Sequence, residues 1–348
     1  MANTDLIDRL SAEGTLAVDE FEELLSTYTP ADRDHATRLA YRVARDRLGS
    51  GLYLWGVVEI ANHCARDCYY CGLRASNAGL ERFRLTREEI LTACAEGHRR
   101  GCRTLVLQGG EECAAEDDGV DELIWAVRKR FPDAAIALAL GEHTHTTYQR
   151  LYAAGADRYL LGHVTADEAH YAQLHPRRRT WAHRVESLKD LRSIGYQVGA
   201  GMLVGLPHQT PRHLAQDLAF LQSFRPEIAL VGTFRPAPDA PLGDQPAGSF
   251  ERTLFVLSLV RLLLPDVLLP CLTSVACAHP RGRELAVMAG VNVLAPNLTP
   301  PRYQALYAPY AGKDTTGVET IEGVDRLAER MGAIGYRLIG EGQEAVRR

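Results

Sequence analysis

The pattern of hydrophobic positions changes once along the chain, close to residue 50. Before that point apolar residues recur at helical spacing, as in the pairs Leu6 and Leu10 or Leu24 and Leu25. Pro30 interrupts this pattern, because proline starts helices more readily than it continues them. The pattern therefore predicts an N-terminal helical extension of two or three helices over residues 1–50.

From residue 53 onward, short apolar runs alternate with amphipathic segments. Strands are expected at 53–61, 104–108, 135–140, 158–162, 197–205, 228–234, 267–273 and 291–296. Helices are expected between them at 86–100, 119–131, 146–154, 181–194, 211–224, 251–264 and 281–289. Apolar strands separated by helices indicate a parallel sheet covered on both faces. Eight such units predict an α/β fold with a complete (β/α)8 TIM-type barrel over 51–310.

A doubly wound open sheet is the alternative, but no G-x-G-x-x-G turn follows the first expected strand. Residues 311–348 are expected to form a helical tail packed on the barrel.

Composition narrows the class of protein. The formal net charge of −5 argues against nucleic acid as the main partner. No apolar run has the length of about 18 residues that a transmembrane helix needs, and the first residues lack the apolar region of a secretory signal. These features predict a cytoplasmic protein without a membrane partner.

Three cysteines follow the first expected strand in the spacing C-x-x-x-C-x-x-C: Cys64, Cys68 and Cys71. Thiolates are the usual ligands of iron–sulfur clusters. Three thiolates on a 4Fe–4S cluster leave one iron open, and the amine and carboxylate of S-adenosylmethionine (SAM) can occupy it. An electron from the cluster would then cleave SAM to methionine and a 5′-deoxyadenosyl radical. Tyr70 is expected to pack beside the adenine or the cluster.

Other interpretations of these cysteines explain less. A structural zinc site takes four ligands, usually from two separate pairs, and no second pair follows. A thioredoxin-like C-x-x-C pair would leave Cys64 unexplained. In a barrel the motif lies at the carboxyl end of the first strand, where active sites of this fold are built.

The stretch VVEIANHCARDCYYCGLR (57–74) resembles the hydrogenase-maturation radical SAM enzymes of the HydE type. It is also similar to their relatives methylornithine synthase (PylB type) and biotin synthase. The resemblance continues through TLVLQGGEE (104–112), GYQVGAGMLVGLPHQT (195–210) and VNVLAPNLTPPRYQALY (291–307). It implies a complete (β/α)8 barrel, a 4Fe–4S cluster on the three cysteines, and SAM as cofactor.

The resemblance also implies which residues border SAM. They are Gly109, Gly110 and Glu111 beside its amino group, Arg184 beside its carboxylate, and Gly205, Leu206 and Pro207 beside its adenosine. A guanidinium–carboxylate pair is physically sensible for Arg184. For the Gly-Leu-Pro segment, the alternative explanation is an ordinary turn, because glycine and proline often mark turns that have no functional role.

This sequence departs from the family after the fourth expected strand. Members usually carry Arg-His-Glu-Thr there, and the glutamate helps to bind SAM, whereas this chain has Gly162, His163, Val164 and Thr165. SAM must therefore be held with one carboxylate fewer, or the substrate pocket has been rebuilt.

Further candidates lie after the expected strands, at the top of the barrel. The candidate catalytic residues are His163 and Cys113, and the candidate substrate residues are Glu142, His143, Arg235, Ser274, Arg281 and Asn297. Each candidate also has an ordinary structural explanation. The histidines could be hydrogen-bonded loop residues, Cys113 could be a small buried residue, and Arg281 could cap the following helix in contact with solvent. The run Arg177–Arg179 is expected to be a solvated loop.

Together these features predict a radical SAM enzyme that acts on a small polar, amino-acid-derived substrate. Carbon–carbon rearrangement and C–S or adenosyl-transfer chemistry are both possible outcomes, as in the HydE and PylB relatives. Flavodoxin or ferredoxin is the expected reducing partner. The alternatives are a hydrogenase-type maturase proper and a non-catalytic iron–sulfur scaffold, which would bind iron without cleaving SAM.

Overall fold

A computed structural model describes residues 2–112, 119–313, 320 and 323–340. Its strands are β1 (Gly51–Ala61), β2 (Thr104–Gly109), β3 (Ala135–Ala139), β4 (Arg158–Leu160), β5 (Gln197–Val204), β6 (Ile228–Thr233), β7 (Val293–Leu294) and β8 (Arg337–Ile339). Its helices are α1 (Asn3–Glu13), α2 (Val18–Thr27), α3 (Pro30–Leu48), α4 (Arg87–Arg99), α5 (Val120–Arg130), α6 (His145–Ala153), α7 (Glu168–Leu174), α8 (Trp181–Ile194), α9 (Pro211–Phe224), α10 (Phe250–Leu263), α11 (Thr273–Ala276), α12 (Gly282–Met288), α13 (Pro301–Gln304) and α14 (Val324–Gly332).

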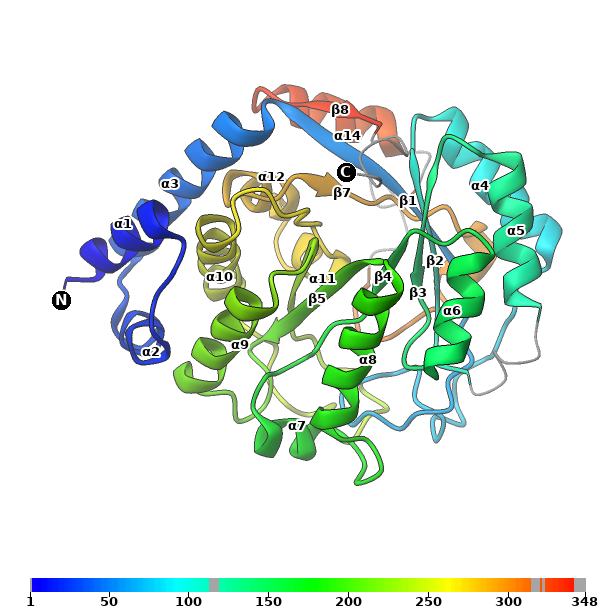
Figure 1. Cartoon of the computed structure of the whole chain (residues 1–348), viewed down its shortest axis with the longest axis horizontal. Coiled ribbons are helices and arrows are strands. Elements are labelled where there is room, and N and C mark those ends of the chain that lie inside the picture. Colours follow the sequence, from blue (N-terminus) through cyan, green and yellow to red (C-terminus); the bar gives the residue numbers. More distant parts are fainter. Residues whose placement is uncertain (1, 113–118, 314–319, 321–322, 341–348) are drawn as a thin grey trace.

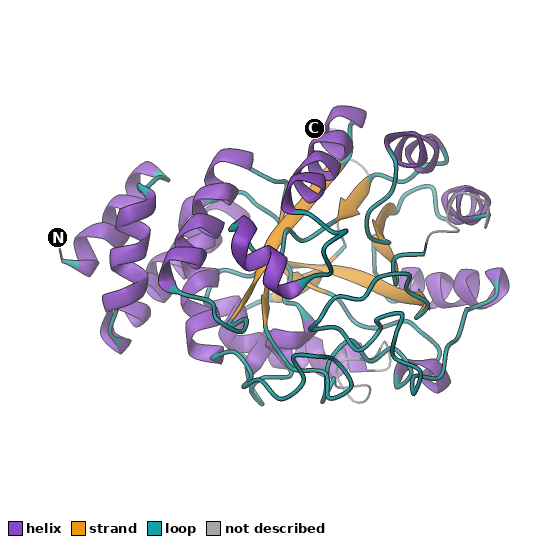
Figure 2. Cartoon of the chain, turned by 90° about the horizontal axis from the view of Figure 1, so that it is seen from below, coloured by secondary structure: helices purple, strands orange, loops and turns teal. Residues whose placement is uncertain are grey.

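The eight strands form one parallel sheet, and seven of them curl into a half-barrel with helices around it (Figures 1 and 2). The strand order is β6-β5-β4-β3-β2-β1-β7. This confirms the predicted α/β class and the parallel sheet. A complete eight-stranded barrel is not confirmed.

The seventh expected strand, at 267–273, is the main difference from the prediction. In its place the structure has two isolated bridges, one from Leu268 to Ile228 of β6 and one from Pro270 to Val293 of β7. Pro270 has no N–H to donate to a ladder, which interrupts regular strand pairing at this residue. Thr273 already begins α11.

Successive side chains of β1 point alternately into the half-barrel and toward the surrounding helices. Trp55, Val57 and Glu59 line the inner cavity, whereas Leu54 and Val58, which point to the opposite face of the strand, belong to the core under the helices. The inner face thus carries an apolar layer around Trp55, and one carboxylate near the carboxyl end of the strand.

The three N-terminal helices lie at one end of the molecule, as Figure 1 shows. Helix α2 packs against α9 and helix α3 packs against α10. At the other end of the sequence, α14 is followed by β8, which pairs with the start of β1. The tail therefore contributes a strand as well as a helix. The division into extension, barrel and tail stays a prediction.

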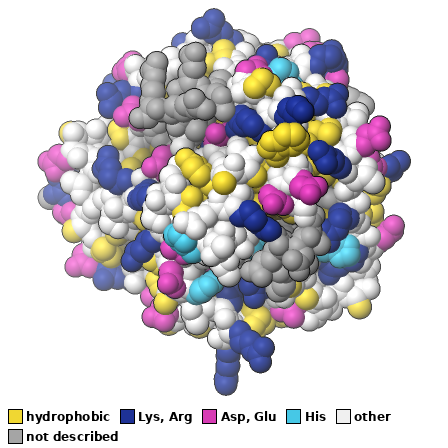
Figure 3. Space-filling view, turned by 45° about the vertical axis from the view of Figure 1, so that its right-hand side comes forward, with side chains coloured by type: hydrophobic (Ala, Val, Ile, Leu, Met, Phe, Trp, Pro, Cys, Tyr) yellow, Lys and Arg dark blue, Asp and Glu magenta, His cyan; other side chains and the backbone are white. Residues whose placement is uncertain are grey.

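The surface view in Figure 3 shows acidic and basic side chains interspersed on one face. Neither sign of charge dominates that face. Among the described residues, no helix combines the length and apolar character that crossing a bilayer requires.

Candidate active site

The three cysteines lie on the loop after β1, which backbone hydrogen bonds fasten to distant segments. Ala65 N–H donates to the carbonyl of Glu111 at 2.7 Å, and Gly72 N–H donates to Pro309 at 2.9 Å. Tyr69 donates to the carbonyl of Leu174 at 2.9 Å. The loop is therefore held by the end of β2, by α7 and by the segment after α13.

The chemistry of this loop fits an iron–sulfur cluster. Burial raises the pKa of all three thiols, and for Cys71 burial together with the neighbouring sulfurs of Cys68 and Cys64 raises it to about 12. A thiol in such a place keeps its proton unless a metal replaces it. Arg179 and Arg184 favour the thiolate of Cys68, and backbone N–H groups do the same at Cys64. The set therefore suits metal-bound thiolates.

Gly110 allows β2 to approach the cysteine loop closely. A Cβ at this position would lie 2.0 Å from the carbonyl oxygen of His63 and 2.8 Å from the Cβ of Cys64. Both neighbours are atoms of the loop itself, so a side chain at Gly110 would have to move the first cysteine.

We expect Gly110→Ala to displace Cys64 and to lower the iron content of the purified protein, at a cost in stability of about 1–3 kcal/mol. Iron analysis and thermal unfolding would measure the two effects. Gly332→Ala, where nothing lies within 4 Å of the new Cβ, is the matched control. Equal iron content in the two variants would contradict the prediction.

Four charged side chains form a buried network beside the cysteines: Glu111, Glu142, Arg179 and Arg184. Arg179 contacts Glu111 at 2.9 Å and Glu142 at 3.5 Å, and Arg184 pairs with Glu142 and also donates to the carbonyl of Gly162. The side chain of Arg179 is 9% exposed, so the expectation of a solvated Arg177–Arg179 loop is wrong for this residue. The structure thus joins Glu111, Arg184 and Glu142, which the sequence suggested one by one, and adds Arg179.

The network makes the stability of the fold depend on acid pH. Burial alone would raise the pKa of Glu142, but the charges of Arg184 and Arg179 outweigh it and lower the pKa to about 2. A lowered folded-state pKa stabilises the fold above the ordinary value near 4.5, and this contribution is lost as the pH falls from there toward 2.

We expect Glu142 to contribute about 3 kcal/mol at pH 7, and most of that to be lost by about pH 3. Urea unfolding of the wild type and Glu142→Gln at pH 7, 5 and 3 would show the difference between the two proteins shrinking as the pH falls. Glu186→Gln, on the exposed face of the same helix as Arg184, is the control. A difference that does not change with pH would contradict the assignment.

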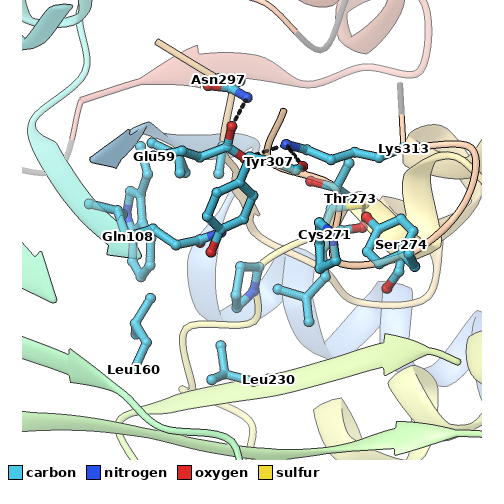
Figure 4. Close-up of a pocket in the computed structure, with 18 of the residues that line it drawn as sticks. Glu59, Gln108, Leu160, Leu230, Cys271, Thr273, Ser274, Asn297, Tyr307 and Lys313 are labelled. Carbon is cyan, nitrogen blue, oxygen red and sulfur yellow. Dashed lines mark hydrogen bonds and ion pairs between the residues drawn. The ribbon is translucent and has the colours of Figure 1, made fainter. Parts of the chain in front are cut away.

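A cavity of about 280 Å³ opens inside the half-barrel. Figure 4 shows Leu160 and Leu230 on one side of it, and Glu59, Lys313 and Asn297 on the other. Lys313 pairs with Glu59, whose second oxygen accepts from the amide of Asn297 at 3.0 Å. The cavity therefore has an apolar wall and an ionic wall.

Tyr307 connects this cavity with the cysteine loop. It lines the cavity and is 5% exposed, and burial raises its pKa well above the ordinary value, with further increases from Glu59, Cys71 and Cys64. Lys313 Nζ lies 4.8 Å from the centroid of the Tyr307 ring, and Pro309, two residues further on, accepts a hydrogen bond from Gly72 of the cysteine loop at 2.9 Å. A ligand in the cavity would therefore lie close to the cysteine loop.

Sequence reasoning missed Glu59, Lys313 and Tyr307 as site residues. One signal was present: Glu59 is a lone carboxylate in an apolar strand, in phase with the inward-facing Trp55 and Val57. Its partner Lys313 lies 254 residues away, so no local pattern could identify the pair.

An apolar cluster brings together three positions that the sequence singled out: Tyr70, Val164 and Leu206. The phenol of Tyr70 lies 3.2 Å from His175 Nε2. Val164 has φ of 73°, which is unusual for a β-branched residue. Gly205, at φ of 85°, lies so close to Gly248 that a Cβ would come within 2.2 Å of its Cα, which gives this glycine a packing role.

His163 lies away from the cavity. It is fully buried, 3.1 Å from the carboxylate of Asp217, and its ring packs against Phe220 with 4.7 Å between centroids. This environment favours the alternative of a hydrogen-bonded packing histidine. The catalytic role of His163 stays a prediction, and Cys113 lies outside the described residues.

The remaining candidates separate into two groups. Ser274 and Asn297 line the cavity. His143 lies instead 3.1 Å from the carbonyl of Leu140, Arg235 donates to the carbonyl of Ala311 at 3.3 Å, and Arg281 is exposed at the start of α12. The structure therefore brings Ser274 and Asn297 together with Glu59 and Lys313, and leaves the other three outside the cavity lining.

Comparisons with known proteins agree on one family. The model of the radical SAM superfamily matches residues 58–221. The chain is 35% identical over 313 residues to the FeFe-hydrogenase maturase subunit HydE of Thermotoga maritima, which covers 90% of this chain and 89% of that protein. It is 24% identical over 281 residues to 3-methylornithine synthase of Methanosarcina acetivorans, with 80% and 79% covered.

A solved structure shows the same fold. The crystal structure of methylornithine synthase (PylB) superimposes with a TM-score of 0.85 at 24% identity, covering 98% of this chain and 99% of that one. The cysteine loop, the half-barrel and the similarity to HydE point the same way. The chain therefore belongs to the radical SAM superfamily, enzymes that use a 4Fe–4S cluster to cleave S-adenosylmethionine reductively.

Proposed function

We propose that this enzyme directs the radical chemistry of SAM at a small, amino-acid-derived substrate held in the cavity of the half-barrel. The observation that carries the proposal is the position of Tyr307, which lines the cavity, lies against Lys313 of the ionic wall, and precedes by two residues the bond between Pro309 and the cysteine loop. When bound, the reduced cluster supplies the electron that cleaves SAM to methionine and a 5′-deoxyadenosyl radical. The apolar side chains around the cavity would exclude water from the reaction.

The chain's own residues would hold the reactants as follows. Cys64, Cys68 and Cys71 would ligate three irons of the cluster. Gly109, Gly110 and Glu111 would border the SAM amino group, Arg184 its carboxylate, and Gly205, Leu206 and Pro207 its adenosine. Because Arg184 pairs with Glu142, that carboxylate would orient the guanidinium for SAM. This would be one way to compensate for the charge that is missing at Val164.

Two finer proposals concern the setting of the reaction. We infer that residues 267–273 take the seventh place of a complete eight-stranded barrel, since Leu268 bridges to Ile228 and Pro270 to Val293. The enzyme would work in the cytoplasm with flavodoxin or ferredoxin as its electron donor. A non-catalytic iron–sulfur scaffold would have no need of the cavity beside the cysteines.

A second candidate function is hydrogenase-type cofactor maturation itself. The 35% identity to HydE favours it, because that similarity covers nearly the whole of both chains. In that case the substrate would carry sulfur or iron on an amino acid. Addition of the adenosyl group and abstraction of a hydrogen atom would then be distinguished by the product.

The test is anaerobic reconstitution with iron and sulfide, followed by incubation with SAM and dithionite or flavodoxin. We expect 5′-deoxyadenosine or an adenosylated product, and more of it when candidate amino acids are added. A protein that holds a full cluster and binds SAM, yet forms neither product with any reductant, would count decisively against the proposal.

A further inference from the structure

The two walls of the cavity differ sharply in chemistry. Leu160, Leu203 and Leu230, from β4, β5 and β6, form the apolar side together with Trp55 from β1. In Figure 4 the labelled Leu160 and Leu230 face the opposite side from Glu59 and Lys313. A ligand that fills this space must therefore present an apolar part to the leucines and a polar part to the ion pair.

The ion pair is deeply buried in the cavity wall. The side chain of Lys313 is 8% exposed and that of Glu59 is 3% exposed, and Lys313 also donates to the carbonyl of Tyr307 at 3.0 Å. Burial of an ion pair seldom stabilises a fold more than apolar residues of the same volume would. Stability alone therefore does not explain why two opposite charges face a cavity that is otherwise mainly apolar.

The two charges in the cavity wall limit which ligands the cavity can bind. Glu59 and Lys313 neutralise each other, so a ligand with a single charge would leave one of them, or itself, without a counter-charge. A zwitterion avoids this cost, because its ammonium can take the carboxylate of Glu59 while its carboxylate takes the ammonium of Lys313. The nearby amide of Asn297 and hydroxyl of Ser274 can donate further hydrogen bonds to a carboxylate.

We propose that the cavity selects a zwitterionic amino acid with an uncharged, mainly apolar side chain. Its ammonium pairs with Glu59, its carboxylate pairs with Lys313, and its side chain lies against Leu160, Leu203 and Leu230. A charged side chain would bury a third charge against the leucines without a partner. This inference rests on the proposed function and narrows its small, amino-acid-derived substrate to an amphipathic amino acid.

The reconstituted enzyme with SAM can be tested by calorimetry against a panel of ligands. L-Norleucine and L-phenylalanine represent the proposed class, and L-lysine and L-glutamate add a side-chain charge. Hexanoate and pentylamine are norleucine without its ammonium and without its carboxylate. We expect lysine and glutamate to bind about 100-fold more weakly than norleucine, and each singly charged analogue at least about tenfold more weakly. Equal or tighter binding of lysine, glutamate or either analogue would overturn the proposal.

Two variants test which residue pairs with the ammonium of the ligand and which pairs with its carboxylate. Glu59→Gln should weaken norleucine about tenfold or more but strengthen hexanoate, because Lys313 then lacks a counter-charge. Lys313→Met should weaken norleucine and strengthen pentylamine for the converse reason. A purely structural ion pair would give no such opposite changes. Arg47→Met, which removes an exposed ion pair with Asp266, is the control.

The result separates this inference from the proposed function. Absence of 5′-deoxyadenosine and of any adenosylated product across the panel defeats the proposed function, whereas preferential binding of lysine or glutamate with normal SAM cleavage defeats only the substrate class. If either variant fails to fold by circular dichroism, the ligand panel on the wild-type enzyme still decides.

Discussion

Replacing Cys68 with alanine is expected to reduce SAM cleavage by about 10³-fold or more and to prevent stable binding of the cluster. The thiol is one of three that share the loop after β1, and Arg179 and Arg184 stabilise its anion. Loss of one of three ligands leaves the cluster with too few thiolates to be retained. Iron and sulfide analysis, visible absorbance and 5′-deoxyadenosine formation after anaerobic reconstitution would measure these effects.

The control for Cys68→Ala is Cys94→Ala. Cys94 lies on the inward face of α4 and is fully buried in the core. Its replacement removes a sulfur of similar burial without touching the loop, so the variant should keep its iron and its activity despite a small loss of stability. A Cys68→Ala protein with the wild-type iron content and activity would show that the cysteine loop is not the cluster site.

The sequence was sufficient to locate the reactive residues of this enzyme, but not to show which charged side chains contact one another. A strand followed by C-x-x-x-C-x-x-C was enough to place the cysteines at the carboxyl end of β1, because both signals are local. Glu111, Glu142 and Arg184 could each be suspected, since they follow β2 and β3 or lie on α8. That they share one buried network depends on how these elements approach one another, which no local pattern encodes.

The differences between prediction and structure have physical causes. The run at 267–273 has the apolar character of a strand, but Pro270 limits it to single bridges. Arg179 follows two exposed arginines, and only tertiary contacts with Glu111 and Glu142 distinguish it from them. His163 follows β4, and its catalytic role stays a prediction; tertiary packing surrounds it with Asp217 and Phe220 of α9 and Trp181 of α8, which no local pattern could indicate.

Replacing Arg184 with methionine is expected to destabilise the fold by about 3–5 kcal/mol, because it leaves Glu142 buried beside a weaker set of partners. The remaining contacts of Glu142 are Arg179 at 3.5 Å and His183 at 3.3 Å. The guanidinium of Arg184 also donates to the carbonyl of Gly162, and methionine would leave that acceptor without this bond. Urea unfolding at pH 7 would measure the loss.

Arg99→Met is the matched control for Arg184→Met, since it makes the same replacement in an ion pair whose arginine is 65% exposed. Exposed pairs contribute about 1 kcal/mol or less, so this variant should unfold nearly like the wild type. Adding Glu142→Gln to Arg184→Met should recover part of the stability, because it removes the charge that was left without its partner. If Arg184→Met were no more destabilised than Arg99→Met, the network could not hold Arg184 in place for SAM, and Glu142 could not compensate for the missing charge at Val164.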